Sequence, residues 1–337
     1  MHVVVADRQP AFEVMDDPFG DAVRSAGGTI RYEDCGTEVE VIQQCSDAEV
    51  LVVFKAPITP RVARNLPETR LIVRVGTGYD NVNVKAATEN DIMVSNTPGY
   101  SRHQVATHAI TLMLAAAREV VDADRQLRTT GGWGNRGQNR QIHGETVGIV
   151  GLGRIGRAVV PKARGFDADV IAFDPYVPED VFEALDVHKV TFDELLASAD
   201  FVTVHTPLTA ETRHLFSTPE FERMRDDAVF VNVSRGPIVD TEALAQAVET
   251  GGIWAAGLDV FEREPPEDSP VFDSDRIVCS PHRAGRTAQS RERKLELTRE
   301  VLASAVAGDH PEYLVNPEVL QYTDSQLNPE YHEWNEE

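Results

Sequence analysis

The stretch TVGIVGLGRIGRAVV, residues 146–160, constrains the fold of this chain more than any other feature. An apolar run of strand length comes first, then three glycines with the spacing GxGxxG (Gly151, Gly153 and Gly156), then a helical pattern. In such a unit the glycines allow a tight turn, close approach of the backbone to a pyrophosphate, and close packing of helix on strand. The stretch therefore predicts the start of a dinucleotide-binding domain, almost halfway along the chain.

Short apolar runs alternate with segments of helical composition on both sides of this stretch. We expect strands at residues 2–6, 29–32, 49–54, 70–75 and 92–95 before it, and at 147–150, 170–173, 201–206, 228–233, 255–260 and 276–280 from it onward. Strands that alternate with helices form parallel sheets. The chain therefore belongs to the α/β class, with two doubly wound parallel-sheet domains expected.

Two long helices are expected to bracket the second series of strands. Ser101 and Gln104 match a capping box that would open a helix over about 101–128, and a second helix is expected over about 288–306. The first helix is apolar around most of its circumference, so we expect it to be buried between two bodies. These helices predict that the second domain is inserted into the first.

Acidic residues strongly outnumber basic ones along the whole chain. The 55 Asp and Glu against 32 Lys and Arg give a net charge of −23. Such a surface repels phosphate backbones and anionic lipids, so we expect no nucleic acid and no membrane as partners. Neither a membrane span nor a signal peptide is recognisable. We expect a cytoplasmic protein of a halophilic organism, whose molar salt screens the self-repulsion.

The chain lacks the spacings that are typical of metal sites. Its three cysteines, Cys35, Cys45 and Cys279, form no CxxC pair, and no HExxH is present. We therefore expect no metal.

Asp174 ends the strand that follows the glycine turn. A carboxylate at this place accepts hydrogen bonds from the ribose hydroxyls of NAD and repels the 2′-phosphate of NADP. Pro175 and Tyr176 come next and supply no cation that would reverse this preference. We expect NAD as the cofactor, and the alternative is that Asp174 only caps a turn.

Arg235, Glu264 and His282 each follow an expected strand, where open α/β sheets bind their ligands. Hydride transfer between a 2-hydroxy acid and a nicotinamide needs a bidentate cation for the carboxylate, a donor to the carbonyl oxygen, and a group that exchanges a proton with it. Arginine suits the first two tasks, and histidine the third, with a carboxylate to orient it. Taken singly, each residue could instead be an ordinary turn or loop residue.

Several motifs in order resemble those of the D-isomer-specific 2-hydroxyacid dehydrogenase family. They are RVGTGYDNV (74–82), VGIVGLGRIGRAV (147–159), FDPY (173–176), HTPLTAET (205–212), VNVSRGPIVD (231–240), GLDVFEREP (257–265) and SPH (280–282). The resemblance implies a Rossmann NAD-binding domain, residues 101–287, inserted into a flavodoxin-like substrate domain, residues 1–100 and 288–337. It also implies a homodimer formed through the NAD-binding domain.

The same resemblance assigns roles to individual residues. It implies that Arg235 clamps the substrate carboxylate and that His282, paired with Glu264, is the acid/base. The backbone of Thr77 and Gly78 would bind the substrate, with Lys55 and Arg74 as further candidates. Cofactor-binding residues are expected to be Gly151, Gly153, Arg154, Ile155, Gly156, Asp174, Pro175, His205, Thr206, Pro207, Val233 and Asp259, of which Asp259 would hold the nicotinamide amide. His103 and His108 are interpreted as packing or polar contacts rather than ligands.

The substrate is less constrained by these motifs. A small 2-oxo acid such as hydroxypyruvate or glyoxylate is favoured. D-3-phosphoglycerate dehydrogenase of serine biosynthesis is an alternative, although residues 54–57, FKAP, stand where such relatives carry an Arg-Ser segment. A third possibility is an NADH-sensing interaction protein, because residues 73–87 and 173–176 resemble the branch of the C-terminal-binding-protein corepressors. Gly285 stands where that branch has a tryptophan.

Overall fold

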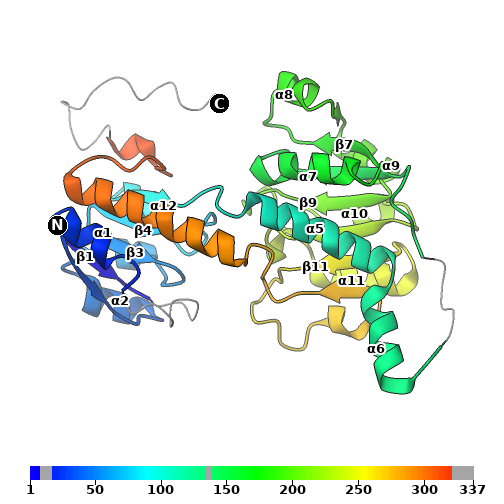
Figure 1. Ribbon diagram of the computed structural model, residues 1–337, viewed down its shortest axis with the longest axis horizontal. Coiled ribbons are helices and arrows are strands. Elements are labelled where there is room, and N and C mark those ends of the chain that lie inside the picture. The colour runs from blue at the N-terminus through cyan, green and yellow to red at the C-terminus, as the bar shows by residue number, and fades with distance from the viewer. Residues whose placement is uncertain (8–16, 134–138, 321–337) are drawn as a thin grey trace. The chain divides into compact units, whose positions relative to one another are not determined.

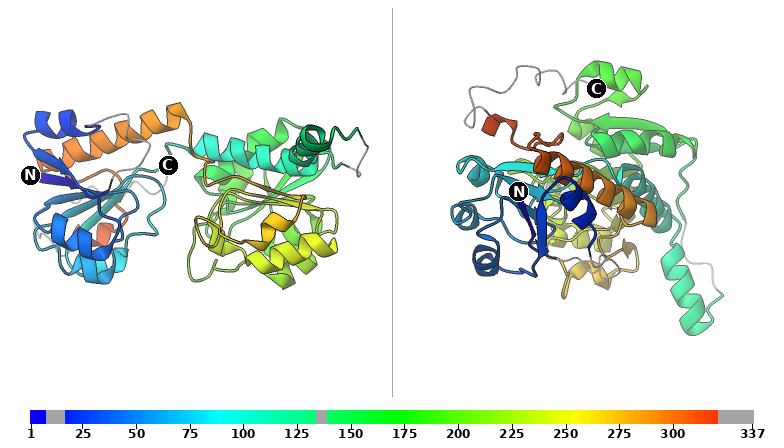
Figure 2. Two further views of the ribbon diagram at one scale, coloured as in Figure 1. Left: turned by 90° about the horizontal axis from the view of Figure 1, so that it is seen from below. Right: turned by 60° about the vertical axis from the view of Figure 1, so that its left-hand side comes forward.

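The computed structural model describes residues 1–7, 17–133 and 139–320. The chain divides into two compact units, one made of Met1–Tyr100 and the segment that begins at Ala288, the other of Ser101–Thr287. Each unit contains a parallel sheet covered by helices on both faces (Figure 1, Figure 2). In the described ranges, no helix is both long and apolar enough to cross a membrane, and no group of three or more His, Cys, Asp and Glu side chains could hold a metal ion.

The sheet of the first unit has five parallel strands in the order β2-β1-β3-β4-β5. The strands are β1 (His2–Val5), β2 (Thr29–Tyr32), β3 (Val50–Val53), β4 (Leu71–Arg74) and β5 (Met93–Asn96). This is the order of flavodoxin-like folds, and it confirms the expected fold of this unit. Each strand end lies within one residue of its expected place. Most residues of β1, β3, β4 and β5 are apolar and buried, as in a parallel sheet covered on both faces, whereas the residues of the edge strand β2 are exposed or half-buried.

Helices cover both faces of this sheet. One face packs against α1 (Gly20–Ser25) and α12 (Ala288–Ala307). The other packs against α2 (Glu38–Cys45), α3 (Pro60–Ala63) and α4 (Val84–Thr88). The described chain returns to this sheet after α12, where the buried Asn316 accepts a hydrogen bond from the Val94 amide at 2.7 Å.

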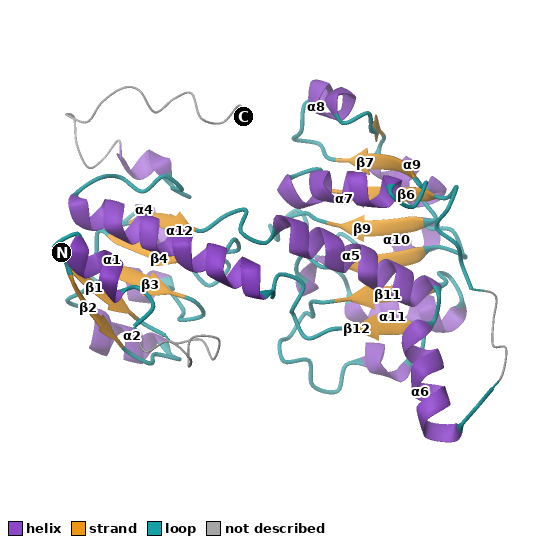
Figure 3. Ribbon diagram, viewed as in Figure 1, coloured by secondary structure: helices purple, strands orange, loops and turns teal. Residues whose placement is uncertain are grey.

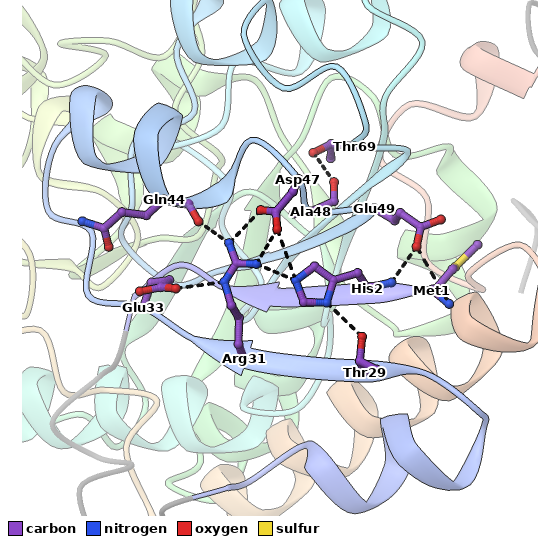
Figure 4. Close-up of polar contacts among 10 residues, drawn as sticks. All are labelled: Met1, His2, Thr29, Arg31, Glu33, Gln44, Asp47, Ala48, Glu49 and Thr69. Atoms are coloured by element: carbon purple, nitrogen blue, oxygen red, sulfur yellow. Dashed lines mark hydrogen bonds and ion pairs between the residues drawn. The ribbon is translucent and has the colours of Figure 1, made fainter.

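A polar network surrounds Arg31 on β2 (Figure 4). Its guanidinium donates to Glu33 at 2.9 Å and to both carboxylate oxygens of Asp47 at 2.7 and 2.8 Å. Its Nη1 also lies 2.5 Å from Nε2 of His2. Because arginine only donates, that nitrogen accepts, and Nδ1 of His2 then donates to Thr29 Oγ1 at 2.9 Å. The network joins β1, β2 and the turn after α2.

The sheet of the second unit has seven parallel strands in the order β12-β11-β10-β9-β6-β7-β8 (Figure 3). The strands are β6 (Thr146–Val150), β7 (Asp169–Phe173), β8 (His188–Lys189), β9 (Phe201–Val204), β10 (Val229–Asn232), β11 (Ala255–Leu258) and β12 (Ile277–Cys279). Counted from β6, this is the Rossmann order 3-2-1-4-5-6 with one further strand, which confirms the expected fold. The sequence analysis did not predict the edge strand β8, because two residues are too few to show a periodic pattern of apolar side chains.

Helices also cover both faces of the second sheet. One face packs against α5 (Arg102–Ala117), α7 (Arg154–Arg164) and α8 (Glu179–Ala184). The other packs against α9 (Phe192–Ser198), α10 (Thr218–Arg223) and α11 (Thr241–Thr250). Gly257 on β11 allows α5 to approach closely, since a Cβ there would lie 2.8 Å from Cβ of Leu112.

The single helix expected over 101–128 is wrong in two respects. It is broken at Glu119, which adopts φ +50°, into α5 and α6 (Val120–Thr130). The expected capping box is also absent, because Ser101 makes no side-chain cap hydrogen bond and has ψ 13°, outside the extended region that such a cap requires. α5 is buried against the sheet of its own unit, whereas α6 has no buried residue and extends away from it (Figure 2).

Candidate active site

The three glycines of the GxGxxG turn have three different surroundings. Gly151 adopts φ +95°, and a Cβ there would lie 2.9 Å from the backbone of His205 and Thr206. A Cβ on Gly156 would collide with the carbonyl oxygen of Gly151. A Cβ on Gly153 would meet nothing within 4 Å, and this residue begins α7 without a side-chain cap. The backbone at Gly153 is therefore open to a pyrophosphate at the N-terminus of α7.

Asp174 follows β7 and binds the glycine turn itself. Its Oδ2 accepts a hydrogen bond from the Leu152 amide at 2.9 Å, and its Oδ1 accepts from the amides of Tyr176 at 3.0 Å and Val177 at 3.2 Å. The carboxylate thus caps a turn, which was the alternative interpretation of this residue. The hydrogen bonds to ribose hydroxyls stay a prediction.

His205 and Thr206 follow β9, next to the glycine turn. His205 is buried, and this burial lowers its pKa to about 3, so the ring is neutral. Its Nε2 contacts Thr203 Oγ1 at 3.0 Å. Among the described residues, neither its Nδ1 nor the buried Oγ1 of Thr206 has a hydrogen-bond partner. Buried polar atoms are rarely left in this state, so both fit a site whose ligand completes them.

The other expected cofactor residues lie at the same edge of the sheet. Arg154 and Ile155 are the first residues of α7, Pro175 follows Asp174, Pro207 follows Thr206, and Val233 follows β10. Because the strands are parallel, their carboxyl ends meet at one edge. The polar atoms of His205 and Thr206 that have no partner among the described residues, and the open backbone at Gly153, fit a dinucleotide at this edge.

Arg235, Glu264 and His282 follow β10, β11 and β12, which are neighbours in the sheet. Nδ1 of His282 lies 2.6 Å from Oε2 of Glu264. Burial alone would raise the pKa of Glu264, but the hydrogen bond and charge of His282, the Phe261 amide and the charge of Arg235 lower it overall. The structure thus pairs an ionised carboxylate with one histidine nitrogen, and Nε2 is the nitrogen that can face a substrate.

The turn of Arg235 packs against the loop that carries Glu264. A Cβ on Gly236 would collide with the backbone of Phe261, so these two segments approach as closely as their backbones allow. Asn232 Nδ2 donates to the Arg235 carbonyl at 2.9 Å, and Nη1 of Arg235 donates to the Ser234 carbonyl at 2.7 Å. These contacts hold Arg235 near Glu264.

The four expected substrate residues belong to the first unit, at the carboxyl edge of its sheet. Thr77 and Gly78 follow β4, and the Thr77 carbonyl accepts a hydrogen bond from Asn96 at 2.7 Å. Arg74 Nη1 donates to the Val75 carbonyl at 3.2 Å. Lys55 follows β3. Their contacts with a substrate stay predictions.

Asp7, which the sequence analysis missed, positions the turn that contains Lys55. Its buried carboxylate accepts hydrogen bonds from the amides of Phe54 at 2.7 Å and Ala56 at 3.0 Å, as well as from that of Lys55. An acidic residue directly after an apolar strand was the available signal.

Comparison with known proteins agrees with the family that the sequence motifs resemble. The family model described as "D-isomer specific 2-hydroxyacid dehydrogenase, NAD binding domain" matches residues 110–284. The chain is 40% identical over 288 residues to a glyoxylate reductase of Korarchaeum cryptofilum, covering 83% of this chain and 86% of the relative. The chain belongs to the D-isomer-specific 2-hydroxyacid dehydrogenase family. As a member, it is an NAD-dependent oxidoreductase of the class that acts on CH–OH groups.

The similar proteins also include family members other than glyoxylate reductases. A D-3-phosphoglycerate dehydrogenase of Methanocaldococcus jannaschii is 38% identical over 297 residues, covering 87% of this chain but 56% of the relative, so the chain spans little more than half of that protein. Among solved structures, a glyoxylate reductase from Paecilomyes thermophila has a TM-score of 0.85 at 28% identity, covering 94% of this chain and 98% of that one. A D-lactate dehydrogenase from Aquifex aeolicus, complexed with NAD and lactic acid, has a TM-score of 0.83 at 25% identity, covering 93% and 98%.

Proposed function

We propose that this protein is an NAD-dependent D-2-hydroxyacid dehydrogenase that reduces a small 2-oxo acid of the glyoxylate or hydroxypyruvate type. The observation that carries the proposal is the 2.6 Å contact between His282 Nδ1 and Glu264 Oε2, with Arg235 on the neighbouring strand end. An acid/base pair beside a fixed cation is what reduction of a 2-oxo acid requires.

Each member of this set has its own task. Arg235 binds the substrate carboxylate through its planar, permanently charged fork. Glu264 accepts a hydrogen bond from Nδ1–H of the protonated His282, so that Nε2–H faces the carbonyl oxygen and delivers its proton to it. The bound NADH supplies the hydride for C2. The backbone of Thr77 and Gly78 binds the carboxylate as well, and the reverse reaction uses the same groups in the opposite protonation state.

The cofactor preference rests on Asp174. Its carboxylate lies at the end of β7, where it accepts hydrogen bonds from the adenosine ribose of NAD and opposes the 2′-phosphate of NADP. We further propose that Asp259 holds the nicotinamide amide, as the family resemblance implies. The preference for NAD over NADP therefore follows from one charge.

The proposal includes a homodimer formed through the NAD-binding domain. α6 exposes Val120, Val121 and Leu127, each at least 50% accessible, and Trp133 after it is 91% accessible. A row of exposed apolar side chains on a helix without buried residues is typical of a surface that a partner covers. A second copy of the chain is the partner that family membership favours.

A second candidate is D-3-phosphoglycerate dehydrogenase, which the 38% identity to the Methanocaldococcus jannaschii enzyme favours. In that case Lys55 or Arg74 would bind the phosphate. The segment 54–57, FKAP, offers one cation where an Arg-Ser segment would offer two phosphate donors. We therefore rank the unphosphorylated acids first.

The test measures the rate of NADH oxidation from the loss of NADH absorbance, in molar potassium chloride. The substrates are glyoxylate, hydroxypyruvate and 3-phosphohydroxypyruvate. We expect rapid turnover with one or both unphosphorylated acids, and much slower turnover when NADPH replaces NADH. Rapid turnover with the phosphorylated acid alone would establish the second candidate. Tight NADH binding without turnover on any 2-oxo acid would contradict the enzyme assignment and favour an NADH-sensing interaction protein.

A further inference from the structure

The turn that carries His282 is held by the side chain of one buried residue, Asp259. Its Oδ1 accepts hydrogen bonds from Ser280 Oγ at 2.6 Å and the Arg283 amide at 2.8 Å, and its Oδ2 accepts from the Ala284 amide at 2.7 Å. Its carbonyl accepts from the His282 amide at 2.9 Å. Burial would raise the pKa of Asp259, but His108, Ser280 and the two amides lower it, so the side chain is an ionised acceptor.

This turn needs such contacts, because His282 adopts φ +45°. Residues other than glycine seldom occupy the left-handed region, and at functional sites the surrounding structure must hold them there. A turn that relaxed toward ordinary dihedral angles would move the His282 ring relative to Glu264. The geometry of the acid/base pair therefore depends on contacts made by its neighbours.

His108 reaches this turn from a distant part of the sequence. It lies on α5, and its Nε2 is 2.8 Å from Ser280 Oγ and 3.5 Å from Asp259 Oδ1. Because a carboxylate only accepts, Ser280 donates its hydroxyl proton to Asp259. The Ser280 oxygen is then the acceptor for a proton on Nε2 of His108. The result is a directed chain of hydrogen bonds from His108 through Ser280 to Asp259.

We propose that His108 and Ser280 are positioning residues of the reaction, which orient the His282 turn through Asp259. This inference rests on the proposed function and adds two residues to which that function gives no role. His108 links the helix at the entrance of the second unit to the loop that carries the acid/base. Without His108, Asp259 keeps the hydrogen bonds from the Arg283 and Ala284 amides, so we expect a change in the placement of His282 and little change in the binding of either reactant.

The experiment compares His108→Leu, His108→Gln and, as a matched control, His103→Leu. His103 lies on the same helix, and its Nε2 accepts a hydrogen bond from Arg102 Nε at 3.2 Å. For His108→Leu we expect kcat to fall about ten- to a hundredfold, because small misplacements of a reacting group have effects of this size. The KM for the 2-oxo acid and the affinity for NADH should stay near the wild-type values.

Rescue separates positioning from simple packing. The amide N–H of Gln can take the place of the Nε2–H of histidine, so His108→Gln should recover most of kcat, whereas His103→Leu should have wild-type kinetics. Ser280→Ala and Ser280→Thr form an independent pair if His108→Leu does not fold: the first removes the hydroxyl and should lower kcat, and the second keeps it.

Three results would overturn the inference: a wild-type kcat in His108→Leu or Ser280→Ala, an equal loss in His103→Leu, or a loss in His108→Leu that comes with weaker NADH binding and is not rescued by Gln. Failure of the proposed function looks different. In that case the wild-type protein itself turns over none of the 2-oxo acids.

Discussion

At the scale of single residues, Arg235 is the group whose chemistry is hardest to replace. Lysine keeps the positive charge but not the planar fork that binds a carboxylate through two parallel hydrogen bonds. We expect Arg235→Lys to lower kcat/KM by about a hundredfold or more, with NADH affinity unchanged. Steady-state kinetics with the best 2-oxo acid measure this directly. Wild-type kinetics in the variant would remove Arg235 from the site.

His205 makes stability depend on pH. Burial lowers its pKa to about 3 in the native protein, whereas the ordinary value is 6.5. Below pH 6.5 the unfolded chain takes up a proton that native His205 does not, so its contribution to stability is lost as pH falls from about 6.5 toward 3. The slope for one such group is about 1.4 kcal/mol per pH unit.

The variant His205→Gln keeps an amide near Thr203 but does not titrate. The free energy of unfolding in urea, measured for both proteins between pH 8 and pH 5, should show a difference that changes only below about pH 6.5. A difference that stays constant over this range would show that native His205 takes up a proton as the unfolded chain does.

Single residues also show what the sequence can and cannot reveal. The common edge at which Arg235, Glu264 and His282 lie was predictable, because each residue follows a parallel strand at its carboxyl end. The contacts of Asp7 with the 54–56 turn and of His108 with Ser280 span 47 to 49 and 172 residues of sequence. A local pattern can single out a residue such as Asp7 after its strand, but it does not encode the distant partner, which only the folded structure shows.

At the scale of elements, the turn between β6 and α7 contains one glycine that packing requires and one that leaves space for the cofactor. A Cβ at Gly156 would collide with backbone, whereas a Cβ at Gly153 would lie in open space. We expect Gly156→Ala to lower the midpoint of thermal unfolding without cofactor. Gly153→Ala should unfold as the wild type does but bind NADH more weakly, because its methyl group occupies the approach to the pyrophosphate. Fluorescence titration with NADH and thermal unfolding measure the two effects, and undiminished NADH affinity in Gly153→Ala would contradict this account of the turn.

The elements themselves were predictable to different degrees. The ends of strands with continuous apolar runs were predicted within a residue or two. Parallel strands that are buried on both faces consist mainly of apolar residues, so the length of the run marks the strand. The break between α5 and α6 was not predictable, because it depends on one residue, Glu119, in a left-handed conformation within a continuous helical pattern. The pattern showed that the segment is helical but not that its burial ends halfway.

At the scale of the whole molecule, the net charge of −23 predicts dependence on salt. Molar potassium chloride shortens the Debye length to about 3 Å and screens repulsion among the acidic side chains. We expect both the midpoint of thermal unfolding and the activity to rise as potassium chloride increases from near zero to molar concentration. Full structure and full activity in dilute buffer without salt would contradict the halophilic interpretation.

The most direct test of the central claim is the replacement of His282 by glutamine. Single-turnover oxidation of bound NADH, with the best 2-oxo acid in excess, isolates the chemical step from substrate binding and product release. We predict that His282→Gln binds NADH as tightly as the wild type and that the rate of this step falls about a hundred- to ten-thousandfold, the usual contribution of a general acid. A variant that oxidises NADH at the wild-type rate would show that His282 does not deliver the proton, and the account of the site would be wrong.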